Sequence, residues 1–261
     1  MTLTAHGTGE NVVLVHGEAA DSRMWDAVSD GLRGEYRVIT PDRRFHGKNP
    51  RPGKNAVDTY EGQAADLEDI LRALDGPAHV VAHSYGAGVA LLTTLHHPEL
   101  VRTLTLIEPP FSGLVRNTDG GFVRELASRD SLVEAVVLLA SRGKEEQATD
   151  LLVDWMQGRR DSARFFSLRT QSVFRANADA VGASSSSPAP RLTCEQLATL
   201  RTPVLVLRGD KTRLWYRRIA EATAECLPKA KSEVIPKSRH MVPLENPDAT
   251  IQRIAAFLAK N

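Results

Sequence analysis

Residues 80–88 read VVAHSYGAG, and this stretch decides the fold. A short apolar run typical of a buried strand leads into Ser84, and an apolar helical pattern then continues to His96. Small side chains stand two positions before and two positions after the serine, at Ala82 and Gly86. A strand-to-helix turn tight enough to lift a serine hydroxyl above a sheet has no room for larger side chains there. The pattern therefore predicts a nucleophile elbow with Ser84 at its tip.

Two other interpretations of this stretch are weaker. Gly86 and Gly88 begin a dinucleotide-binding G-x-G-x-x-G pattern, but the third glycine would fall on Leu91. An ordinary buried serine at a strand end would give a similar pattern. The elbow is therefore a hypothesis that requires a strand, a turn and a helix around Ser84.

Short apolar runs alternate with helical patterns on both sides of the elbow. Runs typical of strands lie at 12–15, 36–39, 101–107, 203–207 and 232–235, and the clearest amphipathic helix lies at 60–74. This alternation predicts an α/β fold with a doubly wound, mostly parallel sheet.

The interval 110–200 breaks the alternation, because it contains helical patterns and no convincing strand. We therefore expect a core domain of residues 1–109 and 201–261 with an inserted helical cap of residues 110–200. A serine- and proline-rich segment at 184–190 is predicted to be a loop within the cap.

Composition and charge exclude several classes of protein. A chain of 261 residues with 42% hydrophobic and 25% charged residues is typical of a globular domain. The formal net charge of +1 disfavours a nucleic-acid partner. No apolar run approaches the roughly 20 residues of a membrane helix, and the N-terminus lacks a signal-peptide pattern. Cys194 and Cys226 make neither a disulfide framework nor a zinc site, which favours a reducing compartment and a cytoplasmic location.

Two further segments supply the chemistry that a serine nucleophile needs. His16-Gly17-Glu18 follows a strong strand, and a turn there can present the backbone N–H of Glu18 to a reacting oxygen. With the N–H of Tyr85 it would form a two-donor oxyanion hole. Alone, this segment would be an ordinary strand-end turn. His240 lies in a loop between the last strand and the closing helix, and a base there can take the proton of Ser84.

With these motifs the chain resembles the α/β-hydrolase superfamily along nearly all its length. The resemblance rests on His16-Gly17 with Trp25 downstream, the elbow, residues 203–209 (PVLVLRG) and residues 240–247 (HMVPLENP). It implies a doubly wound hydrolase sheet and a triad in the order serine, acid, histidine. Residues 41–47 (PDRRFHG) are similar to the family's D-x-R-G-x-G loop, in which Phe45 replaces the first glycine. That loop shapes the pocket floor in the family, so this departure bears on the substrate.

The acid of the triad has two candidates. The family most often places it three residues after Gly209, at Thr212, which has no carboxylate. Glu108, at the end of the preceding strand, resembles branches of the superfamily that carry the acid there, and Asp210 is the alternative. We favour Glu108, because a charged residue at a strand's carboxyl end beside the site is harder to explain otherwise. Asp210 has a simpler role as a turn residue. Either carboxylate would orient the imidazole and stabilise its cation.

The predicted activity is that of a serine hydrolase with a Ser-His-acid triad and an acyl-enzyme intermediate. Its substrate would be an ester, lactone or thioester, or a C–C bond beside a ketone, in a small and largely apolar molecule. Candidates for lining the pocket are His16, His46, Trp155 and Met156. No metal or organic cofactor is implied. The expected partner is a small-molecule substrate, without nucleic acid or membrane, and the chain would be a monomer or homodimer.

Two alternatives use the same fold. One is an acyltransferase, cyclase or lyase, which the missing acid at Thr212 and the Phe45 loop leave open. The other is a non-catalytic ligand-binding protein, against which the serine and histidine pair argues. Turnover of simple esters separates an enzyme from a binding protein.

Overall fold

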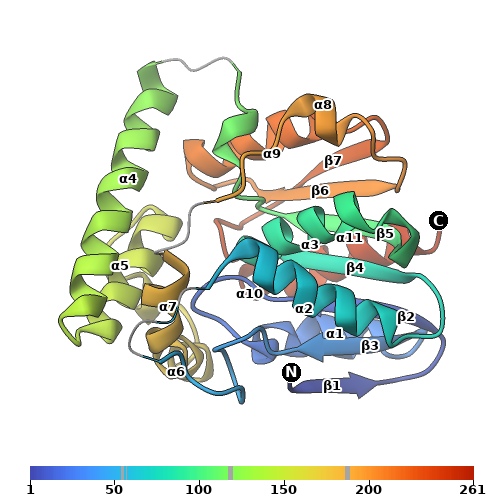
Figure 1. Ribbon diagram of the computed structural model, residues 1–261, viewed down its shortest axis with the longest axis horizontal. Helices are drawn as coiled ribbons and strands as arrows, with labels where there is room; N and C mark the ends of the chain where they lie inside the picture. Colours follow the sequence, from blue (N-terminus) through green and yellow to red (C-terminus); the bar gives the residue numbers. More distant parts are fainter. Residues whose placement is uncertain (54–55, 57, 117–119, 186–188) are drawn as a thin grey trace.

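A seven-stranded sheet forms the centre of the computed structural model (Figure 1), which describes residues 1–53, 56, 58–116, 120–185 and 189–261. The strand order is β1-β3-β2-β4-β5-β6-β7. β1 pairs antiparallel with β3, and all the other pairs are parallel. The strands are β1 (Leu3–His6), β2 (Glu10–Val15), β3 (Tyr36–Pro41), β4 (Ala78–His83), β5 (Val101–Ile107), β6 (Val204–Gly209) and β7 (Ala230–Ile235). The sheet thus has the doubly wound, mostly parallel arrangement that the alternation predicts.

Helices cover both faces of the sheet. Alternate residues of β2 belong to two separate apolar clusters, with Val12 and Leu14 in one and Val13 and Val15 in the other. The first cluster includes α1 (Asp26–Leu32) and α11 (Pro247–Leu258). The second includes α2 (Tyr60–Arg72), α3 (Tyr85–His96) and α9 (Leu214–Cys226). Because both faces are covered, the central strands are buried along most of their length and consist mainly of apolar residues, as is typical of parallel sheets.

A helical insertion follows β5 and precedes β6. It contains α4 (Gly120–Ser141), α5 (Glu145–Gln157), α6 (Leu168–Ala176) and α7 (Ala178–Ser185), and α8 (Cys194–Leu197) leads back to the sheet. Figure 1 shows α4 to α7 gathered at one end of the sheet, where α4 contacts α5, α7 and α9. The described part of this interval contains no strand.

The structure differs from the sequence-based expectation at two places, the segment 184–190 and the two cysteines. The sequence predicts a loop at 184–190, but α7 continues through Ser185, while residues 186–188 lie outside the described residues. Cys194 and Cys226 form a disulfide between α8 and α9, although the sequence argument expected no disulfide framework. The cysteine argument for a reducing compartment therefore loses its basis.

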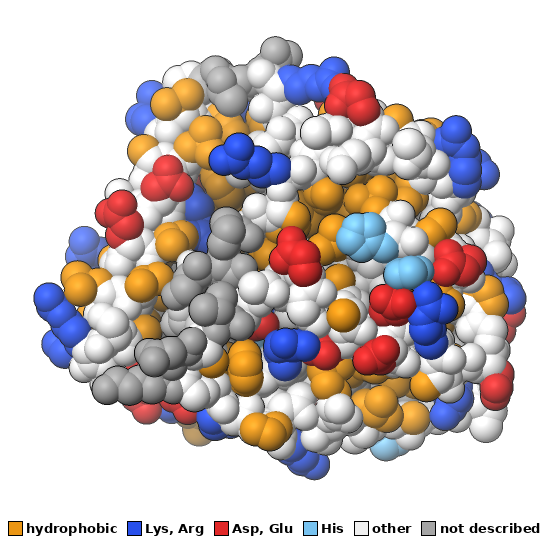
Figure 2. Space-filling model, in the orientation of Figure 1, with side chains coloured by type: hydrophobic (Ala, Val, Ile, Leu, Met, Phe, Trp, Pro, Cys, Tyr) orange, Lys and Arg blue, Asp and Glu red, His pale blue; other side chains and the backbone are white. Residues whose placement is uncertain are grey.

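The surface carries charges of both signs. Figure 2 shows acidic and basic side chains interspersed on one face, without a broad field of one sign. Among the described helices, none is both long enough and apolar enough to cross a membrane.

Candidate active site

Ser84 stands at the turn between β4 and α3, in a strained conformation. Its φ is 52° and its ψ is −119°, in a region that residues with side chains rarely adopt. A Cβ at Gly86 would lie 2.4 Å from the carbonyl oxygen of His16, so the turn and the end of β2 approach too closely for any other residue. Ala82 is fully buried. The strand, turn and helix that an elbow requires are therefore present, and such strain is typical of functional sites.

Ser84 lies beside His240 and Glu108. The Ser84 Oγ is 3.0 Å from His240 Nε2, and His240 Nδ1 is 3.4 Å from Glu108 Oε2. All three side chains are buried. An imidazole that carries its proton on Nδ1 donates to Glu108 and accepts from the serine hydroxyl. The arrangement can therefore move a proton from Ser84 to His240.

Glu108 is held by two further donors. The backbone N–H of Gly209 donates to Oε1 at 2.8 Å, and the Thr212 hydroxyl donates to Oε2 at 2.7 Å. Thr212 occupies the position where the sequence resemblance would place the acid, and it supports the carboxylate that comes from β5 instead. Asp210 is exposed, and its carboxylate accepts the backbone N–H of Ser238 at 2.9 Å. The structure thus brings Glu108 to His240 and directs Asp210 into a turn.

Burial shifts the pKa values of both His240 and Glu108. It lowers the pKa of His240 far below the ordinary value, so the ring is a neutral base at neutral pH. Burial also raises the pKa of Glu108, while the N–H of Gly209 and the hydroxyl of Thr212 oppose that rise. A neutral imidazole is the form that can accept the proton of Ser84.

Two residues that the sequence did not single out for the site hold His240 in place. The ring of Tyr216 stacks on the imidazole at 3.9 Å between centroids. His83 Nε2 donates to the carbonyl oxygen of His240 at 2.9 Å, and burial lowers the pKa of His83 to about 3. The sequence indicates a helix over 214–227, but no pattern in it shows that Tyr216 meets a histidine.

The two oxyanion-hole candidates lie beside the serine. Glu18 and Tyr85 line the same cavity as Ser84. Tyr85 is the first residue of α3, where a backbone N–H has no partner within the helix. A Cβ at Gly17 would lie 2.7 Å from His83 Nδ1 and 3.1 Å from the Ser84 Cβ. Glycine at this position therefore lets the loop after β2 approach the elbow.

The cavity at Ser84 has a volume of about 410 Å³ and lies between the sheet and the helical insertion. Apolar and aromatic side chains make up most of its lining, which also includes two carboxylates and a guanidinium. It is lined by Glu18, Tyr60, Ser84, Tyr85, Pro110, Ser112, Arg129, Asp130, Val133, Leu152, Met156, Ser184, Ser185, Ala189, Trp215 and Tyr216.

Of the four predicted lining residues, the structure places only Met156 at the cavity. His16 is fully buried, where Nδ1 donates to the Gly17 carbonyl and Nε2 accepts the backbone N–H of Arg43. His46 is also fully buried. Trp155 lies behind the lining, against Trp215. These three side chains shape loops and walls and do not face the cavity.

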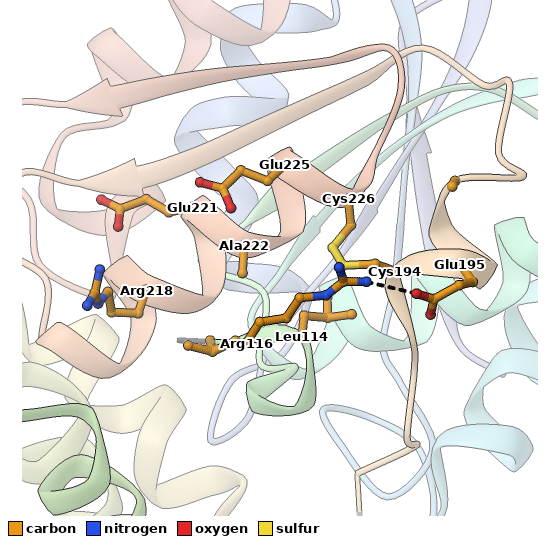
Figure 3. Close-up of a pocket in the computed structure, with 11 residues that line it drawn as sticks. Leu114, Arg116, Cys194, Glu195, Arg218, Glu221, Ala222, Glu225 and Cys226 are labelled. Atoms are coloured by element: carbon orange, nitrogen blue, oxygen red, sulfur yellow. Dashed lines mark hydrogen bonds and ion pairs between the residues drawn. A yellow bond between two sulfur atoms is a disulfide. The ribbon is translucent and has the colours of Figure 1, made fainter. Parts of the chain in front are cut away.

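A second cavity of about 490 Å³ lies away from the candidate triad. Figure 3 shows it beside α8, α9 and the short helix Ser112–Leu114. Its wall contains the Cys194–Cys226 disulfide and an ion pair between Arg116 and Glu195 at 2.8 Å. Neither Ser84 nor His240 lines it.

Comparison with known proteins identifies relatives that are hydrolases. A family model described as "Alpha/beta hydrolase family" matches residues 12–253. A thermophilic esterase from Thermogutta terrifontis, solved with malate bound, superposes with a TM-score of 0.79 and 27% identity, over 99% of this chain and 93% of that one. The 2-(acetamidomethylene)succinate hydrolase of Mesorhizobium japonicum is 24% identical over 97% of this chain and 89% of its own length.

A third relative matches only in part. The probable lysophospholipase BODYGUARD 1 of Arabidopsis thaliana is 31% identical over 46% of this chain. The chain spans only 28% of the length of that relative.

Proposed function

Because the chain belongs to the α/β hydrolase family, we propose that it is a serine hydrolase that cleaves a carboxylic ester, lactone or thioester through an acyl-enzyme. The single observation that carries this proposal is the contact between Ser84 Oγ and His240 Nε2 at 3.0 Å, with Glu108 behind the imidazole. A fold alone does not assign an activity. A nucleophile in contact with a base, which in turn contacts an orienting acid, is direct support for one.

The proposed reaction has two steps. In the first, His240 Nε2 takes the proton of Ser84 as Oγ bonds to the carbonyl carbon, and the resulting imidazolium then protonates the leaving oxygen or sulfur as its bond to that carbon breaks. In the second, His240 takes a proton from water, whose oxygen attacks the acyl-enzyme. Collapse of that intermediate releases a carboxylic acid and returns the proton to Ser84. The proposal requires an ionised Glu108, which would stabilise the imidazolium in both steps.

The oxyanion of each tetrahedral intermediate would be held by the backbone N–H groups of Glu18 and Tyr85. Two donors fixed in advance at the place where charge develops typically account for a large share of such catalysis. The start of α3 adds the positive end of a helix dipole, because Tyr85 is its first residue.

We assign residues 1–109 and 201–261 to a catalytic core and residues 110–200 to a cap. The cavity supports this division, because its lining combines Ser84 and Tyr216 with Arg129 of α4 and Met156 of α5. A substrate in the cavity would be enclosed between core and cap, which would exclude bulk water during the first step. The mainly apolar lining supports a largely apolar substrate, and its two carboxylates and one guanidinium could contact a polar group on it.

The test is intact-mass analysis after exposure to a fluorophosphonate, which phosphonylates activated serines. We expect one adduct on the wild type and none on Ser84→Ala. Ser112→Ala is the matched control, since Ser112 lines the same cavity, and it should still form the adduct. An adduct on Ser84→Ala, or none on folded wild-type protein that also fails to turn over simple esters, would reject the proposal.

A further inference from the structure

The inward-facing side of α4 carries an arginine in line with apolar side chains. Phe122, Arg129 and Val136 follow one another at intervals of seven residues, so they lie on the same side of this helix. Phe122 and Val136 are buried in the apolar core, whereas Arg129 lines the cavity of Ser84. Val133, one turn after Arg129, lines the same cavity. The helix therefore presents a guanidinium to the cavity from a side that otherwise packs against the core.

The charge of Arg129 lies close to the aromatic rings beside His240. Its Cζ is 5.8 Å from the centre of the Trp155 ring. Burial raises the pKa of both Tyr60 and Tyr216, and the positive charge of Arg129 opposes that rise in both cases. Tyr216 is the residue whose ring stacks on the imidazole of His240. The guanidinium therefore lies in the same part of the cavity as the candidate triad.

None of the described acidic residues forms an ion pair with Arg129. Glu125, one turn earlier on α4, pairs instead with Arg213 at 2.9 Å. Asp130 is exposed and is the next residue along the helix, and side chains one position apart on a helix do not face each other. Arg129 itself is partly exposed, and its guanidinium nitrogens keep accessible surface. A ligand in the cavity can therefore reach a cation that no described acid neutralises.

The other carboxylate of the lining has cationic neighbours of its own. Glu18 Oε1 lies 3.5 Å from His46 Nε2. Burial raises the pKa of Glu18, but His46 and the charge of Arg43 outweigh it and keep that pKa below its ordinary value. Neither His46 nor Arg43 lines the cavity. The charge of Glu18 is thus balanced from outside the cavity and does not neutralise Arg129.

Two phenol hydroxyls add hydrogen-bond donors beside this guanidinium. Tyr60 and Tyr216 line the cavity, and neither hydroxyl has a hydrogen-bond partner among the described residues. Burial raises the pKa of both, so both keep their protons at neutral pH and can donate. The cavity thus contains one cation and two neutral donors that lack an acceptor within the described part of the chain. Such a set fits an anion that accepts hydrogen bonds through more than one oxygen.

We propose that Arg129, together with the hydroxyls of Tyr60 and Tyr216, binds a carboxylate of the substrate. The ester cleaved at Ser84 would then belong to a small molecule that also carries a free acid group. This inference rests on the proposed function and names its substrate class. A guanidinium can hold a carboxylate through two parallel hydrogen bonds, and its single charge matches a carboxylate better than the nearly double charge of a phosphate monoester. A volume of about 410 Å³ accommodates a molecule of this size.

The test compares esters that differ only in the anionic group. For an anion on the acyl side, monoethyl succinate and monoethyl glutarate are each paired with the methyl ketone in which a methyl group replaces one carboxylate oxygen. For an anion on the alcohol side, acetoxyacetate is paired with acetoxyacetone. Within each pair, kcat/KM of the anionic ester is divided by that of its neutral partner. Comparing this ratio between variants cancels the intrinsic reactivity of each ester.

The charge and the shape of the arginine are tested by two substitutions. Arg129→Gln should lower the ratio by about tenfold or more for at least one pair, because it removes a charge-assisted contact with the carboxylate. Arg129→Lys should lower it less, because an ammonium keeps the charge without the paired geometry. Tyr60→Phe should lower the ratio of the same pair by about fivefold, since it removes one donor to a charged group.

Arg124→Gln is the matched control, because it removes the same charge from an exposed position of α4 that does not line the cavity. Its ratios should stay within about threefold of wild type. Ratios that Arg129→Gln leaves unchanged in all three pairs would overturn the inference, as would an equal loss of the ratio in Arg124→Gln.

A binding measurement keeps the inference separate from hydrolysis. Calorimetric titration of Ser84→Ala with the three anionic esters and their neutral partners needs no turnover. Tighter binding of an anionic ester, lost when Arg129→Gln is added to Ser84→Ala, would support the inference even if no ester were cleaved, and only the hydrolase proposal would then fail. Equal binding within all three pairs would overturn the inference, whatever the outcome of the fluorophosphonate test.

Discussion

At the scale of single residues, the proposed acid Glu108 comes from a different strand than the family's usual position would give. Glu108 leaves β5 with a φ of 54°, a second strained residue beside Ser84 in the same site. This conformation turns the carboxylate towards His240, where Gly209 and Thr212 hold it. A threonine in place of the usual acid is therefore compatible with a complete triad, since its hydroxyl supports the carboxylate that replaces it.

We expect Glu108→Gln to lower kcat on a simple ester by about a hundredfold to ten-thousandfold, because an amide can neither fix the imidazole tautomer nor stabilise its cation. Asp210→Asn should change kcat by less than about threefold, since Asp210 is exposed and contacts a backbone N–H in a turn. Steady-state kinetics of the two variants on one ester show whether Glu108 or Asp210 is the acid. A larger loss for Asp210→Asn would exchange the two assignments.

The sequence could single out residues of the candidate site only where the chemistry restricts which residue type can stand there. Ser84 and His240 stand out because a tight elbow and a late loop histidine are distinctive patterns in the sequence. Tyr216 and Thr212 did not stand out as part of the site, because ring stacking on an imidazole and a hydroxyl beside a carboxylate depend on tertiary contacts. The same limit applies to His16, which the sequence predicts at the pocket, whereas in the structure both of its ring nitrogens are bonded within loops.

At the scale of elements, the sequence predicts the buried strands and the edge strand β7, but it does not predict the other edge strand, β1. β4 is buried along its whole length, so an apolar run marks it. β1 (Leu3–His6) is exposed at all four positions and joins the sheet only by antiparallel pairing with β3, so no apolar pattern indicates it. α7 extends into a serine-rich segment because packing against α4 and α5 outweighs the weak helix preference of serine.

The elbow gives a prediction about an element, because its turn depends on a close backbone approach. A methyl group at Gly86 would lie 2.4 Å from the carbonyl oxygen of His16 and 2.7 Å from that of Val15, at the end of β2. Backbone atoms cannot move aside as a flexible side chain can. We expect Gly86→Ala to lower the free energy of unfolding by about 2–3 kcal/mol and to abolish fluorophosphonate labelling.

Gly34→Ala is the matched control for this change, because a Cβ there meets nothing within 4 Å. Its free energy of unfolding should stay within about 0.5 kcal/mol of wild type, and its labelling should be normal. Urea unfolding measures both variants. Equal stability of Gly86→Ala and wild type would show that the turn can open without cost, and the elbow geometry would need revision.

At the scale of the whole molecule, the fold buries several histidines that cannot easily take a proton. Burial lowers the pKa of His16, His79, His83 and His240. Above a pH of about 6.5 these rings are neutral in the folded and the unfolded chain, so they contribute nothing to the pH dependence. Below it, the unfolded chain binds protons that the folded chain does not, so the free energy of unfolding falls as pH falls.

Carboxylates can raise or lower the free energy of unfolding over the same pH range. The contribution of one histidine must therefore be measured separately. Glu108 and Asp58 have raised pKa values in the folded chain and favour folding as the pH falls, which opposes the histidines. His83 is the suitable choice, because burial lowers its pKa to about 3 and glutamine can keep its donation to the His240 carbonyl. Comparing His83→Gln with the wild type cancels the contribution of every other group.

We expect His83→Gln to gain about 2 kcal/mol relative to the wild type between pH 8 and pH 5, because the unfolded wild-type histidine is protonated over about 1.5 of those units and the folded one is not. Urea unfolding of both proteins at the two pH values measures this change. At pH 8 the histidine is neutral in both states, so any difference there reports packing alone and is subtracted. A difference that stays constant with pH would mean that the folded chain protonates His83 as readily as the unfolded chain, which its complete burial beside His240 should prevent.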